Sequence, residues 1–208
     1  MNLFYKDEHC EAPEIPSLVP VLQGWIDTQR AYLKACPDDD PPWHYRERSC
    51  IGFLAAGAWR SGGVAIEEWL TERLSESGRS SGRGDLWIRC RDQNSFCIEA
   101  KRMRPNPNVM GNLDKQLVEM ESKLSHAVID VGTHERHSCE KQLGVLFVAP
   151  AYPNGPQEGI DESLATWLEG IYSLPHSAIA WIFPNRAELQ PTSHSTIPGI
   201  VLIARTGT

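Results

Sequence analysis

The chain has 208 residues and a formal net charge of −7 at pH 7. Its hydrophobic fraction of 41% and charged fraction of 23% are typical of a globular domain, and they exclude a disordered, collagen-like or coiled-coil chain. No apolar run reaches the roughly 18 residues that a membrane helix needs. The first residues also lack the basic and apolar regions of a signal peptide, so we expect a cytoplasmic protein without a membrane partner.

The N-terminal part of the chain is expected to be mostly helical. Residues 1–16 are polar and contain prolines, which is typical of an arm. An apolar stripe predicts a helix over 20–35, and a proline- and aspartate-rich segment ends it. Helical spacing then predicts helices over 44–58 and 62–75.

The remainder of the chain alternates between strand and helix signals. The predicted elements are, in order, a hairpin of strands 85–90 and 96–102, a helix over 112–131 with Asn112 as N-cap, a buried strand over 143–149, a helix over 161–173, and strands over 178–183 and 199–204. This order predicts an α/β sandwich around a mixed sheet of about five strands. We divide the chain into an N-terminal arm and helix over 1–42 and a single α/β domain over 43–208.

The hairpin brings two acids and a lysine together. If Cys90 pairs with Phe96 across the turn, Asp85 faces Lys101 and Glu99 lies on the diagonal, within side-chain reach. A register slip of two residues would instead pair Asp85 with Glu99, and the three groups cluster in either case. Strand alternation places the apolar residues on one face and the polar group on the other. The apolar face carries Leu86, Ile88, Phe96, Ile98 and Ala100, and the other face carries Asp85, Trp87, Arg89, Cys97, Glu99 and Lys101.

This residue set is suited to metal-assisted hydrolysis. Two close carboxylates repel each other unless a cation lies between them, and hard oxygen ligands favour Mg²⁺ or Mn²⁺. A metal held by two or three carboxylates keeps open positions for water and a phosphate oxygen. A neighbouring lysine can orient the water or stabilise the developing charge.

Asp85, followed after thirteen residues by Glu99-Ala100-Lys101, resembles the PD-(D/E)XK nuclease superfamily. The resemblance covers roughly residues 60–150 and implies a restriction-endonuclease-like αβα sandwich around a mixed central β-sheet. It implies Mg²⁺- or Mn²⁺-dependent cleavage of DNA, less often RNA. Asp85 and Glu99 would bind the metal together with the carbonyl of Ala100, and Lys101 would position the water.

Members of this family often carry a further acid on the preceding helix. Glu67 matches this position best, because it flanks the apolar stripe of the helix expected over 62–75, and Glu47 competes for the same role. Gln116 resembles a glutamine that some members carry on the following helix, although Met120 stands where those members have a tyrosine. The sequence departs from the family pattern at Gly84, where the family has a proline. The segment 75–84 also offers at most a short edge strand before the aspartate strand.

A local basic zone could meet phosphate in this otherwise acidic chain. Residues 79–104 carry seven basic side chains and three acidic ones. The candidate phosphate contacts are Arg79, Arg83, Arg102 and Arg104.

Three alternatives stay open. The acids and the lysine can form an ordinary exposed salt bridge, worth under about 1 kcal/mol. The chain can be a catalytically inactive binding or assembly module of the same fold, which the negative net charge favours. It can also be a zinc-bearing interaction protein built on His134, His137 and Cys139. The six cysteines lack a paired motif and are interpreted as free or buried thiols, and a homodimer would suit a nuclease that cuts both strands.

Overall fold

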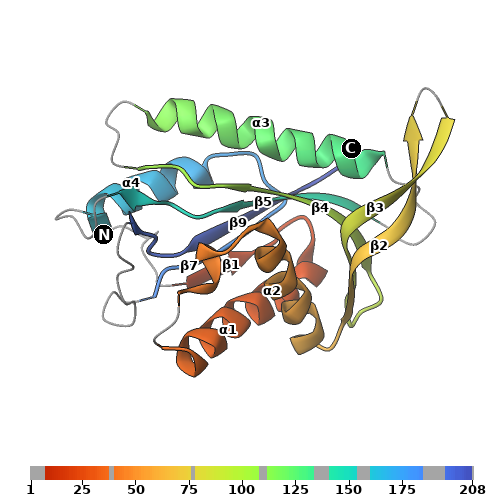
Figure 1. The fold of residues 1–208 in the computed structure, drawn as a ribbon, viewed down its shortest axis with the longest axis horizontal. Coiled ribbons are helices and arrows are strands. Elements are labelled where there is room, and N and C mark those ends of the chain that lie inside the picture. The colour runs from red at the N-terminus through yellow and green to blue at the C-terminus, as the bar shows by residue number, and fades with distance from the viewer. Residues whose placement is uncertain are drawn as a thin grey trace.

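A computed structural model describes residues 8–37, 40–75, 78–107, 112–133, 141–153, 160–184 and 195–207. Over these ranges the chain is a mixed α/β protein with helices on both faces of a seven-stranded sheet (Figure 1). The helices are α1 (Val19–Ala35), α2 (Glu47–Arg60), α3 (Leu113–Gly132) and α4 (Ile160–Tyr172), with short 3-10 turns η1 (Pro16–Leu18) and η2 (Pro42–His44). The strands are β1 (Glu8–Glu11), β2 (Val64–Ser75), β3 (Gly78–Arg89), β4 (Ser95–Met103), β5 (Lys141–Val148), β6 (Tyr152–Pro153), β7 (Ala178–Ile182), β8 (Ser195–Thr196) and β9 (Ile200–Thr206).

The main sheet has the strand order β1-β7-β9-β5-β4-β3-β2. The pair β4 and β5 is parallel and is connected through α3, whereas the other neighbours are antiparallel. Helices α1 and α2 cover one face, and α3 and α4 cover the other (Figure 1). The predicted α/β class and mixed sheet are confirmed. The two strands of this sheet that the sequence did not predict are β1 and β2.

Each face of the sheet has its own apolar core. Leu22 and Trp25 of α1 and Leu54 of α2 pack against one face, and Leu124 of α3 and Trp167 of α4 pack against the other. Strand β5 contributes to both cores because its side chains are buried on both faces, as its continuous apolar run predicts. The expected N-terminal arm contains β1, which pairs with β7, so this segment shares the core of the rest of the chain.

The helix predicted over 62–75 is wrong, because these residues form β2. Gly62, with a φ of 84°, ends α2, and a long antiparallel ribbon of β2 and β3 follows. This ribbon extends past the end of α3 (Figure 1), where only a short edge strand was expected. The supposed apolar stripe is largely solvent-exposed, since Ile66 is 54% and Leu70 is 77% exposed. Strand pairing therefore overrides the local helical pattern.

The β3–β4 hairpin has the faces that were predicted but a different register. Ile88 pairs with Phe96 and Leu86 with Ile98, so the strands are shifted by two residues from the Cys90–Phe96 pairing and have the alternative register, the one that sets Asp85 opposite Glu99. The shift arises in the turn, where the Cys90 N–H donates to the Asn94 carbonyl at 2.8 Å and tightens the loop. An even shift keeps every side chain on its face. The apolar set accordingly lies in the core beneath α1 and α2.

Of the five cysteines that the structure describes, four follow the prediction and Cys97 does not. Cys10, Cys36, Cys50 and Cys90 are free thiols, whereas Cys97, buried against Val131 of α3, is disulfide-bonded. The expectation of free thiols is wrong for Cys97 because tertiary proximity, not spacing along the chain, decides which cysteines pair. Within the described residues, no helix is both long and apolar enough to cross a membrane.

Candidate functional site

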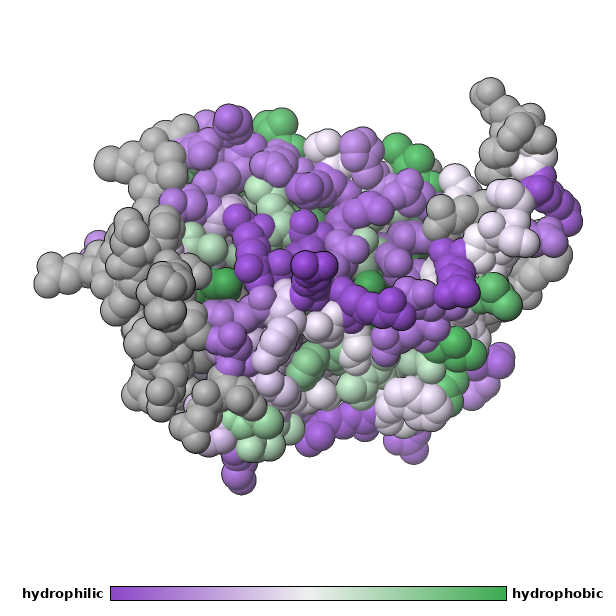
Figure 2. Space-filling view, in the orientation of Figure 1, coloured by the Kyte–Doolittle hydropathy of each residue, from purple (hydrophilic) through white to green (hydrophobic). Residues whose placement is uncertain are grey.

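The candidate site lies where β3 separates from β4. The hydrogen-bonded pairing of these strands ends at Leu86 and Ile98. At the next position the Asp85 side chain takes the place of a backbone acceptor, because its Oδ2 accepts the Ala100 N–H at 2.8 Å. The N–H and C=O of a residue in an extended strand point to the same side, so the Ala100 carbonyl also faces this gap. In Figure 2, hydrophilic side chains run across the middle of the visible face, between α3 and the pair α1 and α2.

Asp85 and Glu99 form a close carboxyl pair. Glu99 is buried, with 4% of its surface exposed, and its carboxyl hydrogen-bonds that of Asp85. Burial raises the pKa of Asp85 to about 6, and the hydrogen bond and the charge of Glu99 act in the same direction against the opposing Ala100 N–H. Two carboxyls in this position require a shared proton or a cation.

Glu47 supplies a third acid to this region. It is the first residue of α2, and its charge contributes to the raised pKa of Asp85. Burial raises the pKa of Glu47 itself, and Glu99 adds to this effect, while Lys101 and Arg102 oppose it. These mutual effects show that Glu47 lies within electrostatic range of the pair.

Glu67 is placed differently from the sequence prediction. It lies on a strand rather than a helix, opposite Leu86, and its side chain is directed towards Gly52 of α2. Glu67 is not among the acids that raise the pKa of Asp85. The helical-wheel argument for Glu67 was wrong because it relied on a helix that does not form.

The neighbouring Glu68 is engaged in ion pairs. It has a φ of 51°, which is rare for a residue with a side chain, and it receives Arg48 and Arg83 at 3.2 Å each. Glu68 therefore ties the ribbon to α2 beside the candidate site.

Lys101 is near the acids but is paired elsewhere. Its Nζ lies 2.8 Å from Oδ2 of Asp130 in the last turns of α3, so the predicted direct pairing of Lys101 with Asp85 is wrong. Asp130 gives the main increase in the pKa of Lys101, against the lowering effect of burial, and Glu99 and Asp85 add smaller increases. Sequence reasoning missed Asp130 because it lies 29 positions further along the chain, on a different element.

Gln116 is a structural residue. It is buried, its Nε2 donates to the Asn106 carbonyl at 2.7 Å, and its Oε1 accepts from Nε1 of Trp167 at 3.2 Å. Both ends of the amide are thus used to join α3 to α4 and to the chain after β4. Because Gln116 and Asp130 are separated by about 20 Å along α3, Gln116 does not reach the acid pair.

The four candidate phosphate contacts form two groups. Arg79 and Arg83 on the ribbon pair with Glu72 and Glu68, at 3.3 and 3.2 Å, and remain largely exposed. Arg102 and Arg104 instead donate to backbone carbonyls of residues 43–45. The second group lies next to the site, since Arg102 influences the pKa of Glu47.

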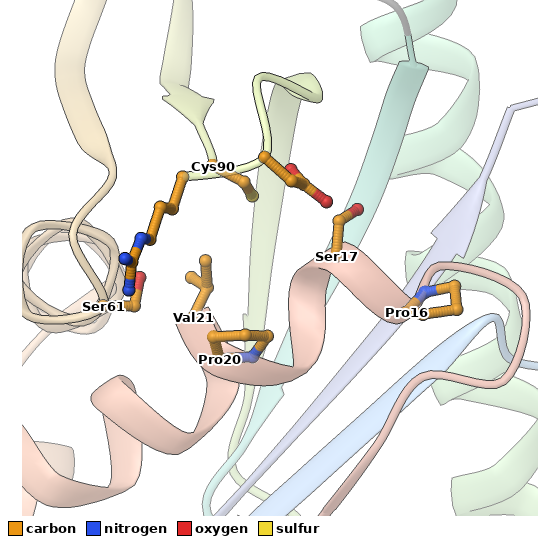
Figure 3. A pocket seen from close by; sticks show the side chains of 8 residues that line it. Pro16, Ser17, Pro20, Val21, Ser61 and Cys90 are labelled. Carbon is orange, nitrogen blue, oxygen red and sulfur yellow. The ribbon is translucent and has the colours of Figure 1, made fainter.

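A separate cavity of about 560 Å³ lies at the C-terminal end of β3 (Figure 3). Its lining residues are Pro16, Ser17, Pro20, Val21, Ser61, Cys90, Arg91 and Asp92. Cys90 is five residues from Asp85, or about 17 Å along a strand. Burial raises the pKa of the Cys90 thiol to about 11, so this thiol is protonated and weakly nucleophilic at neutral pH. Neither Asp85 nor Glu99 lines this cavity, so it is separate from the candidate site.

The oxygen ligands present can be tested against a divalent ion. Among the described residues, no three His, Cys, Asp or Glu side chains are grouped so that they could hold a metal. The chain nevertheless offers two adjacent carboxyls and the Ala100 carbonyl, which is a hard oxygen set of the kind that Mg²⁺ and Mn²⁺ accept. The alternative zinc ligands His134, His137 and Cys139 lie outside the described residues.

No family model, curated protein or solved structure matches the chain.

Proposed function

We propose that this protein is a metal-dependent nuclease that hydrolyses phosphodiester bonds in DNA, with the restriction-endonuclease-like arrangement that the sequence resemblance implies. The observation that carries the proposal is the Asp85–Glu99 pair, in which Glu99 is buried and Asp85 is half-buried, with Lys101 and Glu47 within electrostatic range of it. Two carboxyls this close destabilise the fold through repulsion and desolvation. A cluster of carboxyls with shifted pKa values therefore favours a functional site.

The element order supports the same proposal. Helix α2 is followed by the antiparallel strands β2, β3 and β4, then by α3 and the parallel strand β5. This is the sequence of helix, hairpin-bearing sheet, helix and strand that the resemblance implies. Strand β2 precedes the strand that carries Asp85, at the place where the sequence-based prediction had no strand. Glu47 is an acid on the helix before these strands.

The residues can be assigned roles in this reaction. Asp85, Glu99 and the Ala100 carbonyl would hold Mg²⁺ or Mn²⁺, and Glu47, which is within electrostatic range of Asp85, would add negative charge that favours the ion. A divalent ion there would supply charge stabilisation at the phosphate and acidify a bound water. Lys101 would orient the attacking water, and Arg102 and Arg104 would contact neighbouring phosphates. A homodimer for cutting both strands and a cytoplasmic location stay predictions.

The test is cleavage of plasmid, linear duplex and single-stranded DNA, and of RNA, with Mg²⁺, Mn²⁺ or a chelator. We expect metal-dependent cleavage that Lys101→Ala and Glu99→Gln abolish while the far-UV circular dichroism is unchanged. Glu119→Gln, an exposed change on α3, is the matched control and should cleave normally. Full cleavage by Lys101→Ala with none by Glu99→Gln would refute the role assigned to Lys101, and full cleavage by both variants would refute the proposed site.

A second candidate is a catalytically inactive binding or assembly module of the same fold. It is favoured by the ion pair that holds Lys101 on Asp130 and by the net charge of −7. This candidate predicts no cleavage of any substrate and no shift of the melting temperature with Mn²⁺. The proposed nuclease predicts a stability increase of about 2.7 kcal/mol at a Mn²⁺ concentration 100 times its dissociation constant.

A further inference from the structure

The Lys101–Asp130 ion pair connects the candidate site to α3. The two charged atoms are 2.8 Å apart, and the side chains are 34% and 46% exposed. Lys101 is also within electrostatic range of Glu99 and Asp85. The lysine therefore has two competing sets of anionic partners, and in this structure it pairs with the one on α3.

The position of Asp130 is set by the packing of α3. Val131, the next residue, is fully buried against Cys97 of β4. Two residues before Asp130, the Val128 backbone nitrogen lies so near Gly144 of β5 that a Cβ there would be only 2.6 Å away. Such close contact holds this end of the helix on the sheet, so the backbone of Asp130 has a fixed position relative to Lys101.

From this geometry we infer that Asp130 is a positioning residue, which keeps the Lys101 ammonium beside the Asp85–Glu99 pair without letting it neutralise that pair. The inference rests on the proposed function and adds a residue on α3 to it. A lysine stem of four carbons is long enough to turn towards either set of acids. Were Asp130 neutral, the ammonium would be attracted to the two remaining carboxyls and would compete with a divalent cation for them.

The test compares Mn²⁺ affinity by calorimetry and cleavage kinetics for five proteins: wild type, Asp130→Asn, Asp130→Glu, Lys101→Met and the double variant Asp130→Asn/Lys101→Met. We expect Asp130→Asn to weaken Mn²⁺ binding about 5- to 10-fold, which is the size of effect typical of residues coupled in one network of charges. It should also lower kcat with little change in KM for DNA, because the lysine is misplaced while the DNA contacts are retained. Asp130→Glu, which keeps the carboxylate, should retain most of the wild-type Mn²⁺ affinity and kcat.

The double variant separates positioning from a general effect of charge. If Asp130 acts through Lys101, replacing it in the Lys101→Met background should change Mn²⁺ affinity less than twofold. Glu119→Gln, which breaks the 3.9 Å pair with Lys123 on the same helix, is the control and should match wild type.

Three results would count against the inference, and they are distinguishable. If Asp130→Asn has wild-type Mn²⁺ affinity and kcat, the positioning role is overturned while the proposed function stands. The same holds if Asp130→Asn lowers the Mn²⁺ affinity equally in the wild-type and the Lys101→Met backgrounds. A wild-type protein that neither binds Mn²⁺ nor cleaves nucleic acid would overturn the proposed function, and the inference with it.

Discussion

Replacing Asp85 with asparagine tests the acid pair without any assumption about substrate. The carboxyl has an ordinary pKa of 3.8 and a folded-state pKa of about 6, caused first by burial and then by Glu99. Because the folded pKa is raised, the associated stabilisation is complete below about pH 4 and is lost as the pH rises through about 6. The full shift corresponds to about 3 kcal/mol, and solvent around the partly exposed carboxyl reduces it to about 2 kcal/mol.

The assay is urea unfolding followed by circular dichroism at pH values between 4 and 7.5, with a chelator present. We expect the free energy of unfolding of the wild type to fall by about 2 kcal/mol relative to Asp85→Asn over this range. Glu119→Gln serves as the control, and its curve should run parallel to that of the wild type. Parallel curves for Asp85→Asn and wild type would show that the pair does not share a proton, and the reasoning about the site would fail.

The other predictions concern the ligand set and the packing around it. Glu47→Gln should weaken Mn²⁺ binding several-fold while Glu67→Gln leaves it unchanged, as measured by calorimetry; the reverse order would restore the sequence-based choice of Glu67. Gly144→Ala should lower the free energy of unfolding by about 2 kcal/mol, because the new methyl group would overlap the Val128 backbone, and wild-type stability in urea would contradict this contact. Gln116→Ala should cost about 2 kcal/mol through its two lost hydrogen bonds but leave Mn²⁺ affinity intact, and a loss of affinity would return Gln116 to the site.

The side-chain pattern alone predicted much of what is local in this protein. The stripe of α3 and the alternation in β3 and β4 depend on residues a few positions apart, so they could be interpreted without the fold. The proximity of Asp85, Glu99 and Lys101 was predictable for the same reason, because one hairpin turn brings them together. Even an incorrect register preserved their shared face, since it was wrong by two residues and not by one.

Contacts between distant segments were decided only by the tertiary structure. Residues 64–75 have a helical pattern, yet pairing with β3 makes them a strand, and Glu47 is the helix acid whose charge acts on Asp85. The partner of Lys101 is set by the docking of α3 on β5, which no local spacing in the sequence encodes. The physical reason is that propensity acts between near neighbours, whereas burial and charge pairing depend on which surfaces meet after the chain has folded.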